Sequence, residues 1–289
     1  RIVTMPEAAQ GIRRFAIGLG KKVLIGNTVA MTADAIFALP AGRLSASLAW
    51  LGALCYTVQI YFDFSGYSDM AIGLAGMLGF RFPENFNYPY VSQSITEFWR
   101  RWHISLSTWL RDYLYFPLGR TGNRSKQYRN LLIVFLLCGL WHGAAWHFVI
   151  WGLFHGVFRV FERMGLTELL ERAPRPVRHS YTLLVVIIGW VLFRAETVAN
   201  AGAYLAAMFA LGKSSSPDFE LRRYLPLDVV LALAAGMVGS MPLRLLRPRW
   251  EWPHAIADTA EFAALAGIFL LAVAIASAGT YNPFIYFRF

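Results

Sequence analysis

Histidines and arginines stand unusually close to long apolar runs in the middle of this chain. Residues 97–156 open with Glu-Phe-Trp-Arg-Arg-Trp-His and continue through Leu-Trp-His-Gly to Phe-His-Gly. An ionisable side chain at membrane depth is costly, and it usually lies there for a functional reason. A deprotonated imidazole carries no charge, so it can enter apolar surroundings and still accept a proton near neutral pH. The stretch predicts acid–base chemistry inside a membrane.

His142 is the first candidate for a catalytic residue. It follows Trp141 within the run Asn130–Phe158, which contains 29 residues and no Asp, Glu, Lys or Arg. For a lone histidine on an apolar face, packing against a backbone carbonyl would be the ordinary interpretation. The depth of the uncharged run favours a functional role here. Gly143 has no side chain and would leave room for a substrate beside the ring.

His103 is the second candidate, and a structural role for it is equally compatible with its position. As an interfacial histidine it could simply be wedged between tryptophans. Arg100 and Arg101 lie one helical turn or less away. Their guanidinium groups could bind the phosphates of a nucleotide-type donor, or only anionic lipid.

A metal site is not expected in this sequence. Zinc-binding helices usually place two histidines four residues apart, whereas His147 follows His142 by five residues and precedes His155 by eight. These intervals scatter the rings around a helix, so packing is the better interpretation for His147 and His155. Cys55 and Cys138 lie inside apolar runs and should pack as small apolar side chains.

The composition is that of an integral membrane protein. Of the 289 residues, 57% are hydrophobic and only 15% are charged, whereas soluble domains carry about 25% charged residues. A membrane span requires roughly 20 predominantly apolar residues. The candidate spans are Leu44–Phe62, Asn130–Phe158, Tyr181–Phe193, Val229–Leu243 and Phe262–Ala278.

The net charge of +10 raises the possibility of nucleic-acid binding, which the distribution of the charge argues against. The basic residues form short clusters between apolar runs, at 111–129, 159–178 and 244–249. Such clusters are typical of loops that face anionic lipid on the cytoplasmic side. We therefore expect membrane lipid, and no nucleic acid, as a partner of these charges.

Several elements can be predicted along the chain. Residues 11–39 are mixed and could form an interfacial helix or a span entered through Lys21 and Lys22. Asp63 to Asp69 follow an apolar run and precede another at 70–80, which predicts a broken or re-entrant helix. The two carboxylates could hold the histidines, line a cavity, or only cap the break.

Residues 94–158, which carry the candidate histidines, should consist of three helical segments. Ser94 and Glu97 form a capping box that opens an amphipathic interfacial helix, which should run without interruption until Pro117. Residues 130–158 would measure roughly 43 Å as one helix, more than the hydrocarbon core of about 30 Å. They should therefore form two segments with a bend near His142. A polar linker is expected at 213–217.

At these residues the chain resembles the membrane-bound O-acyltransferase family, in particular its bacterial branch that modifies exopolysaccharides. No phosphate-binding loop, nucleophile elbow or dinucleotide motif competes with this resemblance. The similarity covers most of the chain, and its central block is long and specific. It rests on the segments 61–73, 94–107, 110–115 and 139–143, with weaker similarity at 189–196 and 282–287.

The resemblance implies an all-α fold, a polytopic transmembrane bundle with re-entrant and interfacial helices around an intramembrane tunnel. Residues 1–289 would form a single domain of this fold, the carboxy-terminal portion of a longer protein. The resemblance makes His142 the essential catalytic residue and His103 a second polar group of the active site. The residues expected to bind the donor or line the tunnel are Asp63, Ser65, Tyr67, Asp69, Trp99, Arg100, Arg101, Trp102 and Trp141.

The implied function is an acyl relay in the bacterial inner membrane. A cytoplasmic thioester, with acetyl-CoA as the expected donor and no bound cofactor, would supply an acetyl group for an exopolysaccharide such as alginate. Periplasmic acetyltransferase- or esterase-like partners would complete the transfer to the polysaccharide. His142 would act as general base or carry the acyl group transiently. Three alternatives remain: D-alanyl transfer to teichoic acid by the same fold, a proton-linked transporter without acyl chemistry, and a purely structural membrane scaffold.

Overall fold

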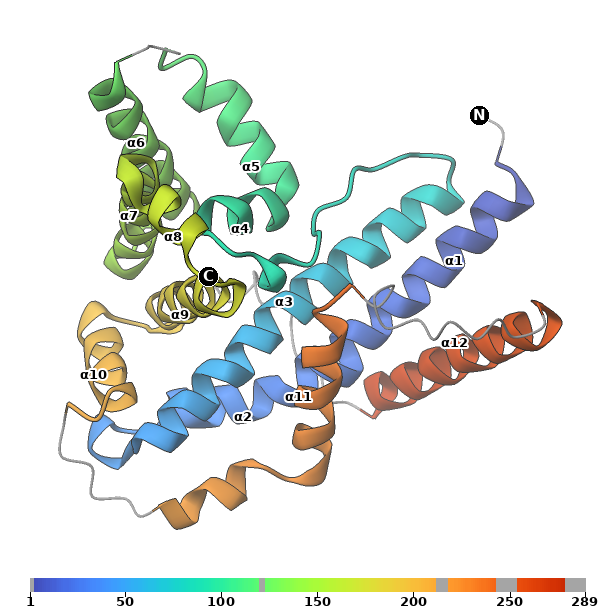
Figure 1. Cartoon of the computed structure of the whole chain (residues 1–289). Coiled ribbons are helices and arrows are strands. Elements are labelled where there is room, and N and C mark those ends of the chain that lie inside the picture. The colour runs from blue at the N-terminus through green and yellow to red at the C-terminus, as the bar shows by residue number, and fades with distance from the viewer. Residues whose placement is uncertain (1–2, 120–122, 212–217, 243–253, 279–289) are drawn as a thin grey trace. The chain divides into compact units, whose positions relative to one another are not determined.

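The computed structural model describes residues 3–119, 123–211, 218–242 and 254–278, and the regular elements in these ranges are all helices (Figure 1). This confirms the prediction of an all-α chain. The expected linker at 213–217, the last basic cluster and the segment 282–287 lie outside the described residues. The chain divides into two compact units, which are described separately below. Of the described residues, the first unit contains 3–32, 55–84, 224–242 and 254–278, and the second contains 33–54, 85–119, 123–211 and 218–223.

The first unit is built on two long helices that cross at glycines. Helix α1 spans Met5–Gly20 and α3 spans Ala46–Met77. A Cβ atom on Gly18 would lie 2.6 Å from the carbonyl oxygen of Gly66, and one on Gly11 would lie 2.7 Å from that of Gly73. Real Cβ atoms do not approach that closely, so the two backbones touch directly at both positions. Such glycine contacts are frequent where membrane helices associate.

The predicted break at 63–69 is wrong, because α3 continues through it as one helix of 32 residues. Gly66 and Gly73 in this part of α3 form the crossing with α1. The acids that suggested a loop are neutralised instead: Asp63 pairs with Lys22, and Asp69 accepts hydrogen bonds from Arg14 and Lys21. A helix can carry buried carboxylates when each has a cationic partner.

The rest of the first unit consists of the amino-terminal region and two apolar helices. Of residues 11–39, positions 11–37 are continuously helical, and 38–39 form a turn. The helical part consists of α1, a π-helical segment Lys21–Gly26, and α2, Asn27–Phe37, which runs into the second unit. Helix α11 spans Leu227–Gly239, and α12 spans His254–Ser277. By length and composition, two helices of the described residues could cross a membrane, α9 (Arg175–Arg194) of the second unit and residues 258–277 of α12.

The second unit contains the stretch that carries the candidate histidines. Its remaining helices are α4 (Ile95–Arg101), α5 (Ile104–Leu110), α6 (Arg124–His142), α7 (Trp146–Phe161), α8 (Thr167–Arg172) and α10 (Val198–Met208). Helices α6 and α7 form a tight hairpin (Figure 1). A Cβ on Gly139 or Gly152 would collide with the facing backbone, which explains the close approach. The predicted bend near His142 is therefore confirmed, since Gly143 ends α6.

The prediction of one uninterrupted amphipathic helix before Pro117 is wrong. The helix stops after Arg101 and restarts at Ile104, because His103 adopts the left-handed conformation with φ 45° and ψ 56°. Trp102 is 2% exposed and anchors the turn among the rings of Phe98 and Trp190. The free energy gained by burying the large indole of Trp102 outweighs the strain of one left-handed residue. Helical periodicity in the sequence does not reveal this balance, so it cannot predict the break.

Candidate functional site

The imidazole of His142 lies in an aromatic cluster made by three elements of the second unit. Ring centroids of Trp151 on α7 and Phe193 on α9 each lie 5.1 Å from it, both nearly perpendicular to its plane. Trp141, its neighbour on α6, lies 4.8 Å away. His142 is the last residue of α6, and Gly143 follows it as the helix C-cap. His142 is partly buried.

The hydrogen bonds of His103 identify its protonated nitrogen. Asn85 Oδ1 accepts from the backbone N–H of Ser105 at 3.2 Å, which fixes that atom as the amide oxygen. The Nδ1 atom of His103 lies 3.2 Å from the same oxygen and must therefore donate to it. In the neutral ring this leaves Nε2 as the basic nitrogen. Burial lowers the pKa of His103 to about 4, so the ring is neutral at physiological pH.

The rings of both candidate histidines contact the same tryptophan, Trp141. The Trp141 ring lies 6.3 Å from the ring of His103 and 4.8 Å from the ring of His142. The structure thus brings together three residues that the sequence analysis placed in one site, from the α4–α5 turn and the end of α6.

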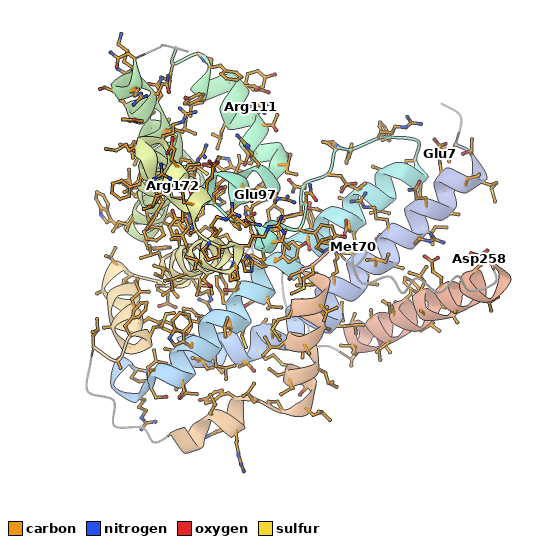
Figure 2. All side chains as sticks on the ribbon, viewed as in Figure 1. Glu7, Met70, Glu97, Arg111, Arg172 and Asp258 are labelled. Carbon is orange, nitrogen blue, oxygen red and sulfur yellow. The ribbon has the colours of Figure 1, made fainter. Side chains whose placement is uncertain are left out.

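A buried carboxylate fixes the helix that leads to His103. Glu162 is 1% exposed, and its side chain accepts from the backbone N–H groups of Ile95 at 2.6 Å and Thr96 at 2.8 Å. Tyr181 donates a further bond at 3.3 Å. An anion at a helix amino terminus satisfies free N–H groups and opposes the positive end of the helix dipole. Ser94 caps the same turn by accepting from the N–H of Glu97, as predicted. The other half of the predicted capping box is wrong, because the side chain of Glu97 (labelled in Figure 2) accepts from the N–H of Gln93 in place of that of Ser94.

A cavity of about 430 Å³, here called the basic cavity, opens beside α4 and α5. Its lining carries four guanidinium groups, and Leu131, Val134 and Phe135 of α6 contribute to its apolar wall. Trp99 also lines it, and the indole Nε1 is buried without a hydrogen-bond partner among the described residues. The four arginines are Arg100, Arg111, Arg159 and Arg163.

A second cavity of about 430 Å³, here called the polar cavity, is lined by the carboxyl ends of α2 and α9 together with α10. It contains Asp34, Arg194, Glu196 and Asn200 among its lining residues. Arg194 donates to Asp34 Oδ1 at 2.8 Å. Phe193, the residue before Arg194, is the one whose ring contacts His142.

The two cavities lie toward opposite ends of the α7–α9 pair. Phe148 at the start of α7 contacts Phe193 at the end of α9, whereas Phe158 near the end of α7 contacts Tyr181 near the start of α9. The helices are therefore antiparallel. The basic cavity includes Arg159 at the end of α7, and the polar cavity lies at the end of α9. His142 is adjacent to the polar end, and the Trp151 and Trp99 rings connect it to the basic one.

The other predicted site residues of the second unit differ in their contacts and exposure. Arg100 lines the basic cavity. Arg101 donates to Glu97 at 2.9 Å and to the carbonyl of Asn87 at 3.0 Å. Trp102 is the buried anchor described above, and Trp141 is 59% exposed.

Four further predicted site residues, Asp63, Ser65, Tyr67 and Asp69, belong to the first unit. Asp63 and Asp69 take part in the ion pairs with α1 and the π-helical segment. Ser65 is 2% exposed, and its hydroxyl has no hydrogen-bond partner among the described residues. Tyr67 is 48% exposed.

Neither of the other two histidines of the hairpin joins a metal site in the described part of the chain. His155 is 1% exposed and packs against Trp99 and Trp151, as the packing interpretation predicts. His147 contacts Phe148. Among the described residues, no three His, Cys, Asp or Glu side chains are grouped closely enough to hold a metal ion.

Sequence reasoning missed Glu162, the basic-cavity arginines Arg159 and Arg163, and the acids of the polar cavity. Glu162 is the first acid after the uncharged run 130–158, and that position was a usable signal. The pairing of Asp34 with Arg194 joins residues 160 positions apart, and only the tertiary fold can show it.

The described residues thus form an all-helical fold in which His103 and His142 contact the same tryptophan, and comparison with known proteins identifies its family. Residues 4–201 match the model of the membrane-bound O-acyltransferase family. A protein described as "Probable alginate O-acetylase AlgI" in Azotobacter vinelandii is 44% identical over the whole chain, and one of that description in Pseudomonas aeruginosa is 54% identical over 91% of it. A teichoic acid D-alanyltransferase of Bacillus subtilis is 36% identical over 51% of the chain and 39% of its own length.

The chain belongs to the membrane-bound O-acyltransferase family. It spans 64% of the length of the Azotobacter relative and 51% of the Pseudomonas relative.

Proposed function

We propose that the complete protein transfers an acetyl group from a cytoplasmic thioester to an acceptor hydroxyl for the O-acetylation of an exopolysaccharide, with alginate as the expected polymer. The observation that carries this proposal is the set of ring contacts of His142. Its ring lies against Phe193, the residue before Arg194 of the polar cavity, and against Trp151, which in turn contacts Trp99 of the basic cavity. The names of the relatives support the reaction type. The single-domain organisation, the tunnel and the inner-membrane location belong to the same proposal.

The basic cavity suits the donor. Guanidinium groups bind phosphate through paired, charge-assisted hydrogen bonds. The cavity combines four of them with an apolar wall that could accept a flexible thioester arm. An acyl thioester on a phosphate-bearing carrier, such as acetyl-CoA, has both features. We therefore place the donor's phosphates near Arg100 and Arg159, with the thioester directed toward Trp99.

The chemical step follows from a neutral imidazole. His142 removes the proton of the acceptor hydroxyl as its oxygen attacks the acyl carbonyl carbon. The C–O bond forms, the C–S bond breaks, and the leaving thiolate takes up the proton from the imidazolium. In the variant with a transient acyl carrier, the imidazole nitrogen attacks the carbonyl carbon, the C–S bond breaks and the thiolate leaves. The acceptor oxygen then attacks the acyl group, the C–N bond breaks, and the proton of the hydroxyl passes to the thiolate. His103, neutral and oriented by Asn85, would hydrogen-bond the reacting groups through Nε2.

The test uses the complete protein in a deletion strain. His142→Ala at normal expression should abolish O-acetyl groups in the exopolysaccharide, as measured by mass analysis. His147→Ala, a change on the same hairpin, should leave them present. Persisting acetylation in His142→Ala would favour the transporter or scaffold alternatives. The chain is also similar, at lower identity, to a teichoic acid D-alanyltransferase. If D-alanyl esters were found in place of acetyl esters, they would support D-alanyl transfer as the reaction.

A further inference from the structure

The lining of the basic cavity carries an excess of positive charge. Four arginines line it, and no Asp or Glu is among the described residues of the lining. Arg111 is paired with its neighbour Asp112 at 2.7 Å. The guanidinium groups of Arg100, Arg159 and Arg163 form no ion pair with another described residue. Like charges around one cavity repel one another, so an anionic ligand between them would relieve the repulsion.

Arg159 is tied to the buried Glu162 through one hydroxyl group, that of Thr96. The Nη1 atom of Arg159 donates to the Thr96 hydroxyl, and this hydroxyl lies 2.5 Å from Glu162 Oε2. A guanidinium can only donate and an ionised carboxylate can only accept. The Thr96 hydroxyl therefore accepts from Arg159 and gives its own proton to Glu162. Because Glu162 is also fixed by the N–H of Ile95, the bridge starts from a rigid base.

The Thr96 bridge holds the Arg159 guanidinium and leaves most of its donors available. Within the described part of the chain, the hydroxyl of Thr96 is the one hydrogen-bond acceptor of this guanidinium. The Nε atom of Arg159 is buried and has no partner among the described residues. A carboxylate bound directly to the guanidinium would occupy its paired N–H groups, whereas a single hydroxyl leaves a pair free for a phosphate.

From these contacts we propose that Thr96, oriented by Glu162, is a positioning residue that directs the Arg159 guanidinium toward a phosphate group of the acyl donor. The inference rests on the proposed function, which places the donor in the basic cavity. It makes the cavity selective for a thiol carrier that bears phosphate over the same thiol arm without phosphate. Because the Thr96 hydroxyl acts through Arg159, its contribution to binding depends on the phosphate of the ligand.

The test compares two ligands that share the thiol arm. The complete protein in lipid nanodiscs binds labelled CoA, which is displaced by unlabelled CoA or by pantetheine, the same arm without phosphate. Thr96→Val removes the hydroxyl and keeps the backbone N–H that donates to Glu162, and Thr96→Ser keeps both. Thr167→Val is the control, because the Thr167 hydroxyl donates to the backbone carbonyl of Glu162 at 2.9 Å and does not line the basic cavity. Thermal unfolding midpoints show that each variant is folded.

Wild type should bind CoA at least about tenfold more tightly than pantetheine, because pantetheine cannot form the charge-assisted hydrogen bonds to phosphate. Thr96→Val should raise the Kd of CoA about tenfold and leave the affinity for pantetheine unchanged. A general disturbance of the fold would weaken both ligands alike. Thr96→Ser and Thr167→Val should bind CoA as wild type does.

Four results would overturn the inference: equal affinity of wild type for CoA and pantetheine, wild-type binding of CoA by Thr96→Val, an equal loss for both ligands in Thr96→Val, or no recovery in Thr96→Ser. The proposed function is tested separately in the deletion strain. If the complete wild-type protein restores no O-acetyl groups there, the proposed function is wrong, whatever the binding of CoA.

Discussion

A single amide positions the second histidine of the site. Asn85 Oδ1 accepts from both His103 and the N–H of Ser105, so it fixes the tautomer as well as the ring orientation. The left-handed backbone of His103 is the strained conformation that this arrangement maintains. Strain at a non-glycine residue costs on the order of 1–3 kcal/mol and persists only where the surroundings enforce it.

The protonation of His103 should respond to a charge at residue 85. The wild-type ring has a pKa of about 4, so it stays neutral above pH 5 and its titration does not limit acyl transfer there. Asn85→Asp places an anion beside Nδ1, which raises the pKa and protonates more of the ring as pH falls. The rate of acyl transfer should then decline between pH 7 and 5 relative to wild type. Asn87→Asp, exposed on the same loop, is the control, and identical profiles for both variants would contradict this role of Asn85.

At the scale of elements, Glu162 joins the end of α7 to the start of α4. Glu162→Gln keeps the shape but removes the charge and one acceptor oxygen, leaving N–H groups of Ile95 or Thr96 less satisfied. The expected loss of unfolding free energy is about 1–3 kcal/mol. Thermal unfolding of the detergent-solubilised protein measures it. Glu168→Gln, on exposed α8, should change the midpoint little, and an equally small change in Glu162→Gln would show that the α4 terminus is satisfied otherwise.

Two glycines on α3 allow a matched test of the crossing with α1. A Cβ on Gly73 would lie 2.6 Å from the carbonyl oxygen of Gly11, whereas one on Gly76 would have its nearest neighbour at 3.8 Å. Alanine in a helix is favoured over glycine by about 0.5–1 kcal/mol. Gly76→Ala should therefore leave the thermal midpoint equal or higher, and Gly73→Ala should lower it. A Gly73→Ala protein as stable as Gly76→Ala would mean that the helices do not touch there.

Sequence reasoning succeeded for elements set by local patterns and failed where tertiary contacts decide. Uncharged length and glycines located the α6–α7 bend at His142, and the Ser94 cap was visible as a motif. The continuity of α3 was not visible, because the cations that neutralise Asp63 and Asp69 come from another helix. Cavities between helices depend on distant pairs in the same way, so Arg159 and Glu196 could not be placed from the sequence.

At the scale of the whole molecule, α12 presents an apolar surface that a membrane would cover. It is 6% buried over residues 258–277 and has the hydropathy of a membrane span. In intact membranes Leu270→Cys should resist a membrane-impermeant maleimide and react only after denaturation. Glu168→Cys should react from the aqueous phase once the membrane is made permeable. The native Cys55 and Cys138 are buried and should contribute little background. Ready labelling of Leu270→Cys would place α12 in water.

The central claim is that His142 carries out acyl transfer. The most direct measurement is ester formation from labelled acetyl-CoA by the complete protein in nanodiscs, with His142→Ala and His147→Ala compared at equal amounts of folded protein. Loss of a general base typically reduces the rate by about 10²–10⁴-fold. The account predicts a loss of that size for His142→Ala and near-normal transfer for His147→Ala. Transfer by His142→Ala at the wild-type rate would contradict it.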